Sequence, residues 1–340
     1  MCLRRVCVAL IIPLALSACT AVTPPQPTPT ALPLPSATHT PTAPPTFTPL
    51  PTATPLPTAT PTLTPTATPW PLQVSITLEP SQVLQGQSAI VRVAANRPCA
   101  LSGAIEGRPL FFVPEGALVE APHRYAAYVG VHAMAPLGAQ TLWVQARAED
   151  GQQVTLETAL TVLAGNYAEE RIRLTAETQK LLDPAISEPE QRRIDQVYAR
   201  RTPTKLWQGT FSWPWQGPIT SSFGTRRAYG GGPATTFHAG LDIDGEAGDP
   251  VQAPAAGIVA LAEMLQVRGG TVILDHGAGV LSGYFHLQSI AVREGERVEP
   301  GTLLGEIGST GLSTGSHLHW EMRVGGIAVD PREWLERPMD

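Results

Sequence analysis

Apolar and polar residues alternate with a period of two along much of the chain after residue 72. Turn-forming residues separate the alternating runs, and this combination is typical of short, half-buried β-strands. The clearest apolar members are Val74, Ile76 and Leu78, and later Leu142, Val144 and Ala146. Short strands at this spacing predict an Ig-like β-sandwich over residues 72–165.

Residues 166–206 are predicted to form a helical connector, because charged residues there flank apolar positions. Ser187-Glu188-Pro189-Glu190 is typical of a helix start, with Ser187 as N-cap and proline in the first turn. From about Trp207 onward the chain is rich in glycine and strand-like, with an apolar run at 271–274 and an alternating run at 280–285. A second, all-β domain is therefore expected over residues 207–340.

The N-terminus has the features of an export signal. Arg4 and Arg5 precede an apolar stretch that is too short to span a bilayer of ~30 Å, so residues 1–19 predict a signal peptide. It ends in Leu16-Ser17-Ala18-Cys19, which resembles a bacterial lipobox. The resemblance implies a lipid on Cys19 and an extracytoplasmic protein anchored to the cell membrane. An ordinary cleaved signal, with Cys19 incidental, is the alternative.

A tract of proline, threonine and alanine with almost no charge occupies residues 20–71. Such a segment cannot bury a core, and proline favours the extended polyproline II form. The tract is predicted to be a disordered linker, and it would serve either as a stalk that lifts the domains from the membrane or as a plain spacer.

Charge and cysteine content narrow the class of protein further. The formal net charge is -6 and only 15% of residues are charged, so the chain lacks the excess of positive charge that attracts nucleic acid. Once Cys2 and Cys7 leave with the signal and Cys19 holds a lipid, only Cys99 remains. We expect Cys99 to be an inert buried thiol.

Candidate chemistry is concentrated in the C-terminal domain, where five of the eight histidines lie at or after residue 238. His317 and His319 stand two residues apart in a strand-like segment. Side chains at i and i+2 of a strand project from one face, roughly 6–7 Å apart. One of the two could therefore bind a metal while the other reaches a water beside it.

His238 and Asp242 form a second motif, four residues apart. On a regular strand they would lie ~13 Å apart, so they can converge only if the backbone bends, and Gly240 is the expected place for the bend. Two imidazoles and one carboxylate form a zinc ligand set that leaves a fourth position open, as catalytic sites require.

The last ~130 residues resemble the M23 family of zinc peptidases, the lysostaphin-type or LytM-like domains. The motifs that support this resemblance, besides the HxxxD and HxH motifs, are Ile219-Thr220-Ser221-Ser222-Phe223-Gly224-Thr225-Arg226, residues 250–257, Asp275-His276-Gly277, Tyr284-Phe285-His286-Leu287 and Gly308-Ser309-Thr310-Gly311. The resemblance implies an all-β fold of the barrel-sandwich hybrid type and a peptidoglycan endopeptidase with one Zn²⁺ per domain.

The resemblance also implies roles for individual residues. His238, Asp242 and His319 would be the zinc ligands. His286 and His317 would be the catalytic pair: one moves the proton of the attacking water, and the other stabilises the developing oxyanion. The sequence does not show which of these two histidines has which role. Tyr229 is a candidate transition-state stabiliser, and His276 is expected to be structural.

The main alternative is a non-catalytic envelope lipoprotein that binds peptidoglycan or activates other wall hydrolases. Some members of the family have lost active-site residues, but all five positions are filled here. A carrier of the biotinyl or lipoyl type is excluded because no lysine follows Lys205.

Overall fold

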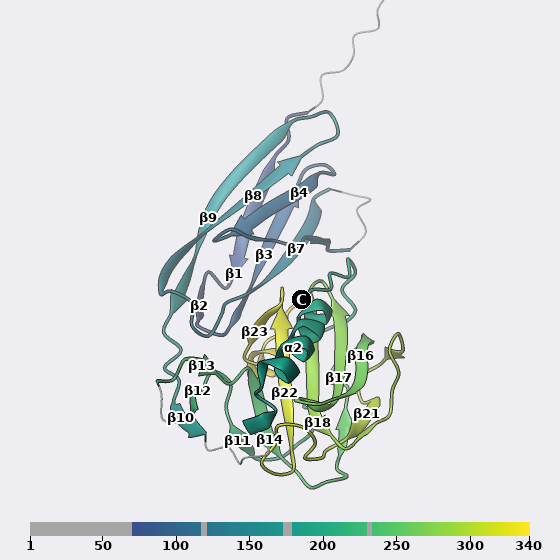
Figure 1. Ribbon diagram of the computed structural model, residues 1–340. Helices are drawn as coiled ribbons and strands as arrows, with labels where there is room; N and C mark the ends of the chain where they lie inside the picture. Colours follow the sequence, from purple (N-terminus) through teal and green to yellow (C-terminus); the bar gives the residue numbers. More distant parts are fainter. Residues whose placement is uncertain (1–69, 117–120, 173–178, 230–232) are drawn as a thin grey trace, which may run out of the picture. The chain divides into compact units, whose positions relative to one another are not determined.

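The computed structural model describes residues 70–116, 121–172, 179–229 and 233–340. The predicted signal peptide, with Cys19, and nearly all of the predicted linker lie outside these residues. Two regions rich in β-strands follow one another, with one long helix in the segment that connects them (Figure 1). The mainly-β prediction is therefore confirmed. In the part of the chain that the structure describes, none of the helices is long and apolar enough to cross a bilayer.

The first region is a sandwich of two sheets. One sheet has the order β1-β3-β7-β6, formed by Val74–Glu79, Ser88–Ala95, His123–Gly130 and Val113–Pro114. The other has the order β2-β9-β8-β4-β5, formed by Gln82–Leu84, Gln153–Leu163, Gly138–Arg147, Ala100–Ile105 and Arg108–Pro109. Val91 and Val93 of the first sheet share a core with Leu142 and Val144 of the second. The predicted alternation is confirmed, while the comparison with Ig domains stays a prediction.

The second region is built on an eight-stranded sheet of order β11-β14-β22-β18-β17-β16-β20, with β23 paired to β22. Its strands are Ile219–Ser221, Gly240–Asp244, His317–Val324, Val280–Leu287, Gly269–Gly277, Gly257–Leu265, Arg297–Val298 and Ile327–Val329, in that order. A small sheet β15-β21-β19 comprises Pro250–Gln252, Leu303–Glu306 and Ser289–Ile290. Another, β10-β12-β13, comprises Glu169–Ile172, Arg226–Tyr229 and Thr236–Phe237, and a short helix α3, Arg332–Glu336, follows β23.

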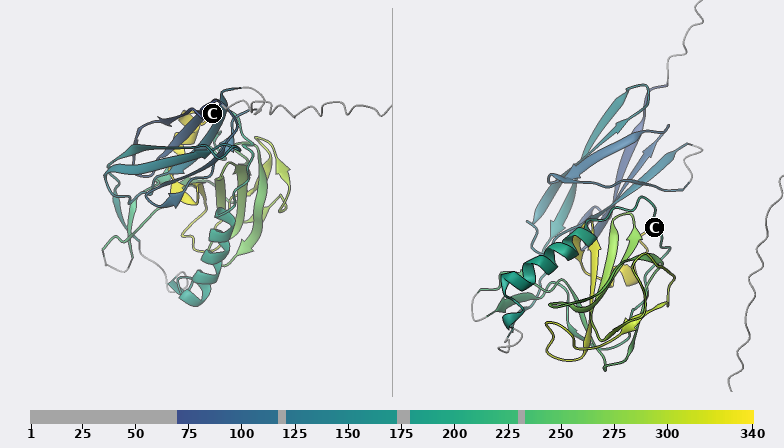
Figure 2. Two further views of the ribbon diagram at one scale, coloured as in Figure 1. Left: turned by 90° about the horizontal axis from the view of Figure 1, so that it is seen from above. Right: turned by 45° about the vertical axis from the view of Figure 1, so that its right-hand side comes forward.

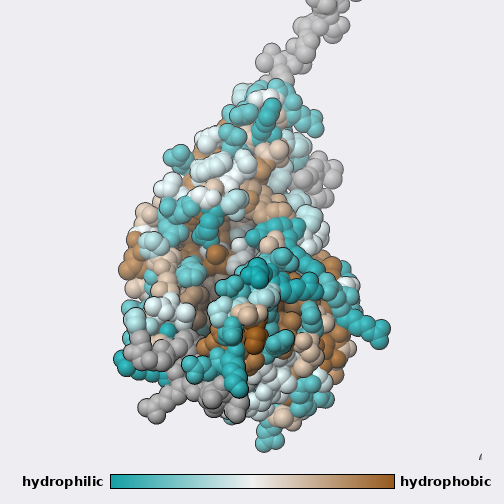
Figure 3. Space-filling view, in the orientation of Figure 1, coloured by the Kyte–Doolittle hydropathy of each residue, from teal (hydrophilic) through white to brown (hydrophobic). Residues whose placement is uncertain are grey.

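Strands β17 and β18 are buried along their whole length, which explains their apolar sequences. One face packs on the main core, through Val272 and Tyr284 among others. The other face is covered by helix α2, Pro184–Tyr198, whose Ile194 packs with Ile273 and Phe285. Figure 2 shows the helix against this face in two further views. The outward side of α2 is hydrophilic (Figure 3).

The connector differs from the prediction in two places. Helix α2 starts one turn early, because Asp183 is the N-cap and accepts a hydrogen bond from Ala185 N, whereas Ser187 lies inside the helix. Residues Glu169–Ile172 are a strand, β10, rather than a helix, because they pair in parallel with β12 far along the chain. Long-range pairing therefore overrides the local helical preference at this point.

The two regions share a core. Ile90 and Tyr128, on the outer face of the first sheet of the sandwich, are buried with Trp207 and Trp334 of the second region. This second contact surface explains why β3 and β7 are largely buried on both faces. Apolar side chains of the sandwich are therefore buried together with those of the C-terminal domain.

A buried carboxylate reinforces this contact. Glu333 of α3 accepts hydrogen bonds from the backbone N–H of Ser88, at 3.0 Å, and from the Ser88 hydroxyl, at 2.5 Å. Arg337 donates to the Ser88 carbonyl at 2.9 Å and to Glu333 at 3.4 Å. Burial raises the pKa of Glu333 to about 7, although the Ser88 hydrogen bonds oppose the shift.

Replacing Glu333 with Gln is expected to change how stability depends on pH. The folded-state pKa lies above the unfolded value, so the folded protein binds this proton more tightly and loses stability as pH rises from about 4.5 to about 7. Relative to E333Q, wild type should lose on the order of 2 kcal/mol of unfolding free energy between pH 5 and pH 8. Urea titrations of both proteins at the two pH values measure this difference, and parallel pH dependences would contradict it.

Candidate metal site and active site

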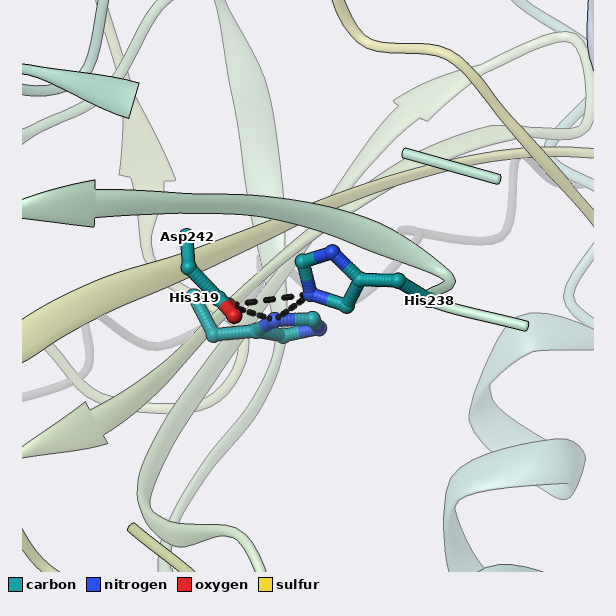
Figure 4. Close-up of side chains that lie close together, drawn as sticks. All are labelled: His238, Asp242 and His319. Carbon is teal, nitrogen blue, oxygen red and sulfur yellow. Dashed lines mark hydrogen bonds and ion pairs between the residues drawn. The ribbon is translucent and has the colours of Figure 1, made fainter. Parts of the chain in front are cut away.

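Three side chains of the second region converge on one point (Figure 4). Asp242 Oδ1 lies 3.0 Å from His238 Nε2 and 2.6 Å from His319 Nδ1. The two imidazole nitrogens are themselves 2.9 Å apart. All three atoms lie within 4.8 Å of one another and could hold a metal ion. The structure therefore brings together the three residues that the sequence singled out.

Strand pairing explains how the three meet. Asp242 on β14 lies directly opposite His319 on β22 in an antiparallel register, so the two side chains share a face. His238 reaches them from the short segment of His238 and Ala239 that separates β13 from β14. Gly240, where the sequence predicts a bend, is the first paired residue of β14. Its lack of a side chain serves another purpose: a Cβ there would lie 2.3 Å from the Trp320 carbonyl oxygen.

The atoms that face away from the meeting point have partners of their own. His238 Nδ1 lies 3.1 Å from the Ser222 carbonyl oxygen, which can only accept, so Nδ1 is the protonated nitrogen. His319 Nε2 lies 3.2 Å from Glu321 Oε1 and donates to that carboxylate. Arg227 Nη2 donates to Asp242 Oδ2 at 3.2 Å.

These hydrogen bonds place the protons of His238 and His319 on the outer nitrogens, so the nitrogens that face Asp242 carry lone pairs. With their outer nitrogens protonated, His238 and His319 each direct a bare nitrogen at the Asp242 carboxylate, and such an arrangement is repulsive unless a cation or a proton lies between the three atoms. Metal-binding histidines usually donate a hydrogen bond from the other ring nitrogen to a carbonyl or carboxylate group, as His238 and His319 do here. The donor set therefore fits zinc.

Without a metal, a proton takes this place. Burial lowers the pKa of His319, but hydrogen bonds with Asp242 and Glu321 outweigh it and raise that pKa to about 9. Burial raises the pKa of Asp242, but its contacts with the His238 and His319 rings outweigh this effect, so the net shift is far below the usual range. Burial lowers the pKa of His238. The metal-free cluster thus holds one proton at neutral pH, on His319.

Zinc binding should release that proton. Because the pKa of His319 is raised to about 9, the apparent association constant for zinc should increase about tenfold for each pH unit between pH 6 and pH 8. Calorimetric titration at pH 6.5 in two buffers of different ionisation enthalpy measures the proton count, which we expect to be close to one. A buffer-independent binding enthalpy would contradict this picture.

His286 and His317 lie beside the cluster, with ring centroids 4.9 Å apart. His286 Nδ1 donates to the Thr310 carbonyl and His317 Nδ1 to the Gly315 carbonyl, both at 2.8 Å. Both rings therefore have Nε2 free, and that of His317 lies 3.8 Å from Asp242 Oδ1. Burial, followed by the charges of His319 and His317, lowers the pKa of His286 to about 3, so this ring is neutral at physiological pH.

The other two predicted residues are placed differently. Tyr229 ends β12, but its side chain is outside the described part of the structure. His276 is buried away from the cluster, with Nδ1 2.8 Å from the Ala256 carbonyl oxygen and Nε2 2.7 Å from the Ser282 hydroxyl. Its contacts agree with the structural role that was expected of it.

A groove of ≈ 520 Å³ is lined by the three residues of the cluster and by the neighbouring His286 and His317. Helix α2 and the segment before it line one part of the groove, through Leu182, Ser187 and Gln191 among others. The sequence pattern does not predict this contribution, nor those of Arg227 and Glu321, which also line the groove. Glu321 had a visible signal, because it follows His319 by two residues on an alternating strand and so shares its face.

Residues 236–331 match the model of peptidase family M23. The C-terminal domain belongs to this family. The M23 domain here is 36% identical over 114 residues to the peptidoglycan DD-endopeptidase ShyC of Vibrio cholerae, a match that covers 34% of this chain and 26% of ShyC. It is 34% identical over 135 residues to the murein hydrolase activator NlpD of Escherichia coli, covering 39% of this chain and 32% of NlpD. The chain thus spans about a third or less of these two relatives.

A solved structure extends the likeness beyond the M23 domain. A putative M23 peptidase from Pseudomonas aeruginosa superposes with a TM-score of 0.54 at 27% identity, and the match covers 74% of this chain and 94% of that one. The match therefore includes more than the M23 domain of this chain and supports the fold described above.

Proposed function

We propose that this chain is a zinc-dependent endopeptidase that hydrolyses the peptide cross-links or stem peptides of bacterial peptidoglycan. The observation that supports it best is the convergence of His238, Asp242 and His319 in one groove, with His286 and His317 beside them. Three protein ligands leave the fourth position of a zinc ion open, as catalytic sites require, whereas structural zinc sites use four protein ligands and close the coordination sphere.

His238 would hold the metal through Nε2, His319 through Nδ1 and Asp242 through Oδ1. A bound zinc supplies a Lewis acid that polarises the scissile carbonyl and lowers the pKa of a water to about 7. The chain's own residues direct this chemistry. Ser222 and Glu321 fix the two imidazole rings, and Arg227 occupies Asp242 Oδ2 so that Oδ1 faces the centre.

His286 and His317 would move protons and stabilise charge. Each ring is anchored through Nδ1 on a carbonyl, so Nε2 accepts a proton when the ring is neutral and donates one when it is charged. One ring accepts the proton of the nucleophilic water and then protonates the departing amine. The other, when charged, donates a hydrogen bond to the oxyanion that forms from the amide carbonyl.

The substrate and the location rest on different support. Peptidoglycan is favoured because relatives such as ShyC are named as peptidoglycan DD-endopeptidases. An extracytoplasmic, lipid-anchored location is favoured by the lipobox-like segment ending at Cys19 and by the NlpD relatives, one of which is named a lipoprotein. The proline-rich tract between the anchor and the domains would act as a spacer that lets the enzyme reach an insoluble substrate.

A binding or activating role without turnover is the second candidate, because NlpD of Escherichia coli is named a murein hydrolase activator. The presence of all five site residues favours an enzyme over a protein that only binds or activates. The two candidates differ in one measurable property, the release of soluble peptide fragments from purified wall.

Substitutions at the site should separate metal binding from turnover. His319→Ala should abolish zinc binding, because it removes one of three protein ligands and leaves Asp242 beside a void. His286→Gln and His317→Gln should retain zinc but lower the rate by roughly 10²- to 10⁴-fold, as expected for lost proton transfer. Zinc content by metal analysis and fragment release from defined peptidoglycans by mass spectrometry measure the two properties.

His123→Ala is a suitable control, since His123 is a buried histidine of the sandwich on strand β7. It should keep both zinc and turnover at a cost in stability. Activity that survives His319→Ala would overturn the ligand assignment. A wild-type protein that binds zinc yet leaves cross-linked peptides intact would instead favour the activator.

A further inference from the structure

The sheet face that contains His319 has a gap at Glu321. Glu321 pairs with Gly240 on β14 and with Gly283 on β18, so neither neighbouring strand has a side chain at this position of the face. Directly paired residues of antiparallel strands project from the same side, so the two glycines leave open the space on both sides of the carboxylate. Glu321 is nevertheless buried, at 5% exposure.

Tyr198, the last residue of helix α2, fills the gap. Its hydroxyl lies 3.2 Å from Glu321 Oε2, and the side chain is fully buried, at 1% exposure. A Cβ on Gly283 would lie 2.2 Å from the Tyr198 hydroxyl oxygen, so only glycine at position 283 allows this approach. Gly283 is not in a left-handed conformation, and close approach is the reason for its presence here.

The contacts of Glu321 divide between its two oxygens. Oε2 accepts from the Tyr198 hydroxyl and from Arg323, whose Nε and Nη2 lie 3.0 and 2.8 Å away. Oε1 is left for His319 Nε2, at 3.2 Å. The Arg323 guanidinium also lies over the Tyr198 ring, 4.7 Å from its centroid. Three donors on one oxygen hold the carboxylate in the rotamer that directs the other oxygen at His319.

Hydrogen bonds and apolar packing hold helix α2 on the sheet and so keep Tyr198 in contact with Glu321. In its middle, Glu190 accepts hydrogen bonds from the backbone N–H groups of Val267 and Arg268, at 2.7 and 2.9 Å. Near its end, Ile194 and Val197 are buried with Tyr198 against the sheet. These contacts in the middle and the C-terminal half of α2 therefore fix the position of the Tyr198 hydroxyl.

We propose that Tyr198 is a positioning residue of the metal site, acting through Glu321 to orient His319 so that Nδ1 faces the metal. The inference rests on the proposed function only in taking zinc as the metal, and it requires no peptide hydrolysis. Residue 198 lies outside the stretch 236–331 that matches the M23 family model, so the metal site would depend on a helix that precedes the family domain.

The test compares two tyrosines in the full chain. Tyr198→Phe removes only the hydroxyl, and zinc affinity, measured by competition with a chromophoric chelator, should fall about tenfold, at the low end of the effect of outer ligand partners. Tyr128→Phe is the matched control, because the Tyr128 hydroxyl is also buried and donates to the Met339 carbonyl at 3.1 Å, away from the cluster. It should cost stability and leave zinc affinity unchanged.

A spectroscopic readout and a double-mutant cycle show whether the effect runs through Glu321. The visible absorption of the Co²⁺-loaded protein should change in Tyr198→Phe and stay the same in Tyr128→Phe. Glu321→Gln alone should weaken zinc binding by about 10- to 100-fold, and adding Tyr198→Phe to it should have little further effect.

Unchanged zinc affinity and Co²⁺ spectrum in Tyr198→Phe would overturn the proposal, as would an equal loss of zinc affinity in Tyr128→Phe. An undiminished effect in the Glu321→Gln background would also overturn it. A wild-type protein that binds zinc but cuts no peptidoglycan would contradict the proposed function alone. The two ideas can therefore fail separately.

Discussion

The antiparallel pairing of β14 with β22 places Asp242 opposite His319 and Gly240 opposite Glu321. Both the metal cluster and the gap that admits Tyr198 depend on this register. A slip of one residue would move His317, His319 and Glu321 to the opposite face, which is filled by Leu318, Trp320 and Met322. Burial of these large side chains therefore holds the register on which the polar face relies.

The polar face concentrates charge where water is largely excluded. Glu321 is buried and Arg323 is mostly buried beside it, and each charge would be costly there without its partner. Burial raises the pKa of Glu321, yet Arg323 and His319 outweigh that effect and lower the pKa well below its usual range. A permanently ionised carboxylate behind His319 keeps the proton on Nε2, which leaves Nδ1 available at the cluster.

Local periodicity was enough to predict the strands, the shared face of His317 and His319, and a site in the C-terminal region. It failed where distant segments decide the outcome. The strand at Glu169–Ile172 exists because β12 pairs with it. The earlier start of α2 has a local cause instead, since Asp183 is its N-cap. The spacing of His238 and Asp242 could not show that Asp242 lies opposite His319 in the sheet. Tyr198 and Arg227 reach the site only through tertiary packing, which no local pattern in the sequence reveals.

Helix α2 connects these observations, because it takes part in the core, the groove and the cluster at once. Its apolar side completes the burial of β17 and β18, its N-terminal part lines the groove, and its last residue reaches Glu321. The Glu190 carboxylate binds two backbone N–H groups of the turn between β16 and β17, so the helix cannot shift without breaking buried hydrogen bonds. The width of the groove and the orientation of His319 are thus set by the same element, and a displacement of α2 would alter both together.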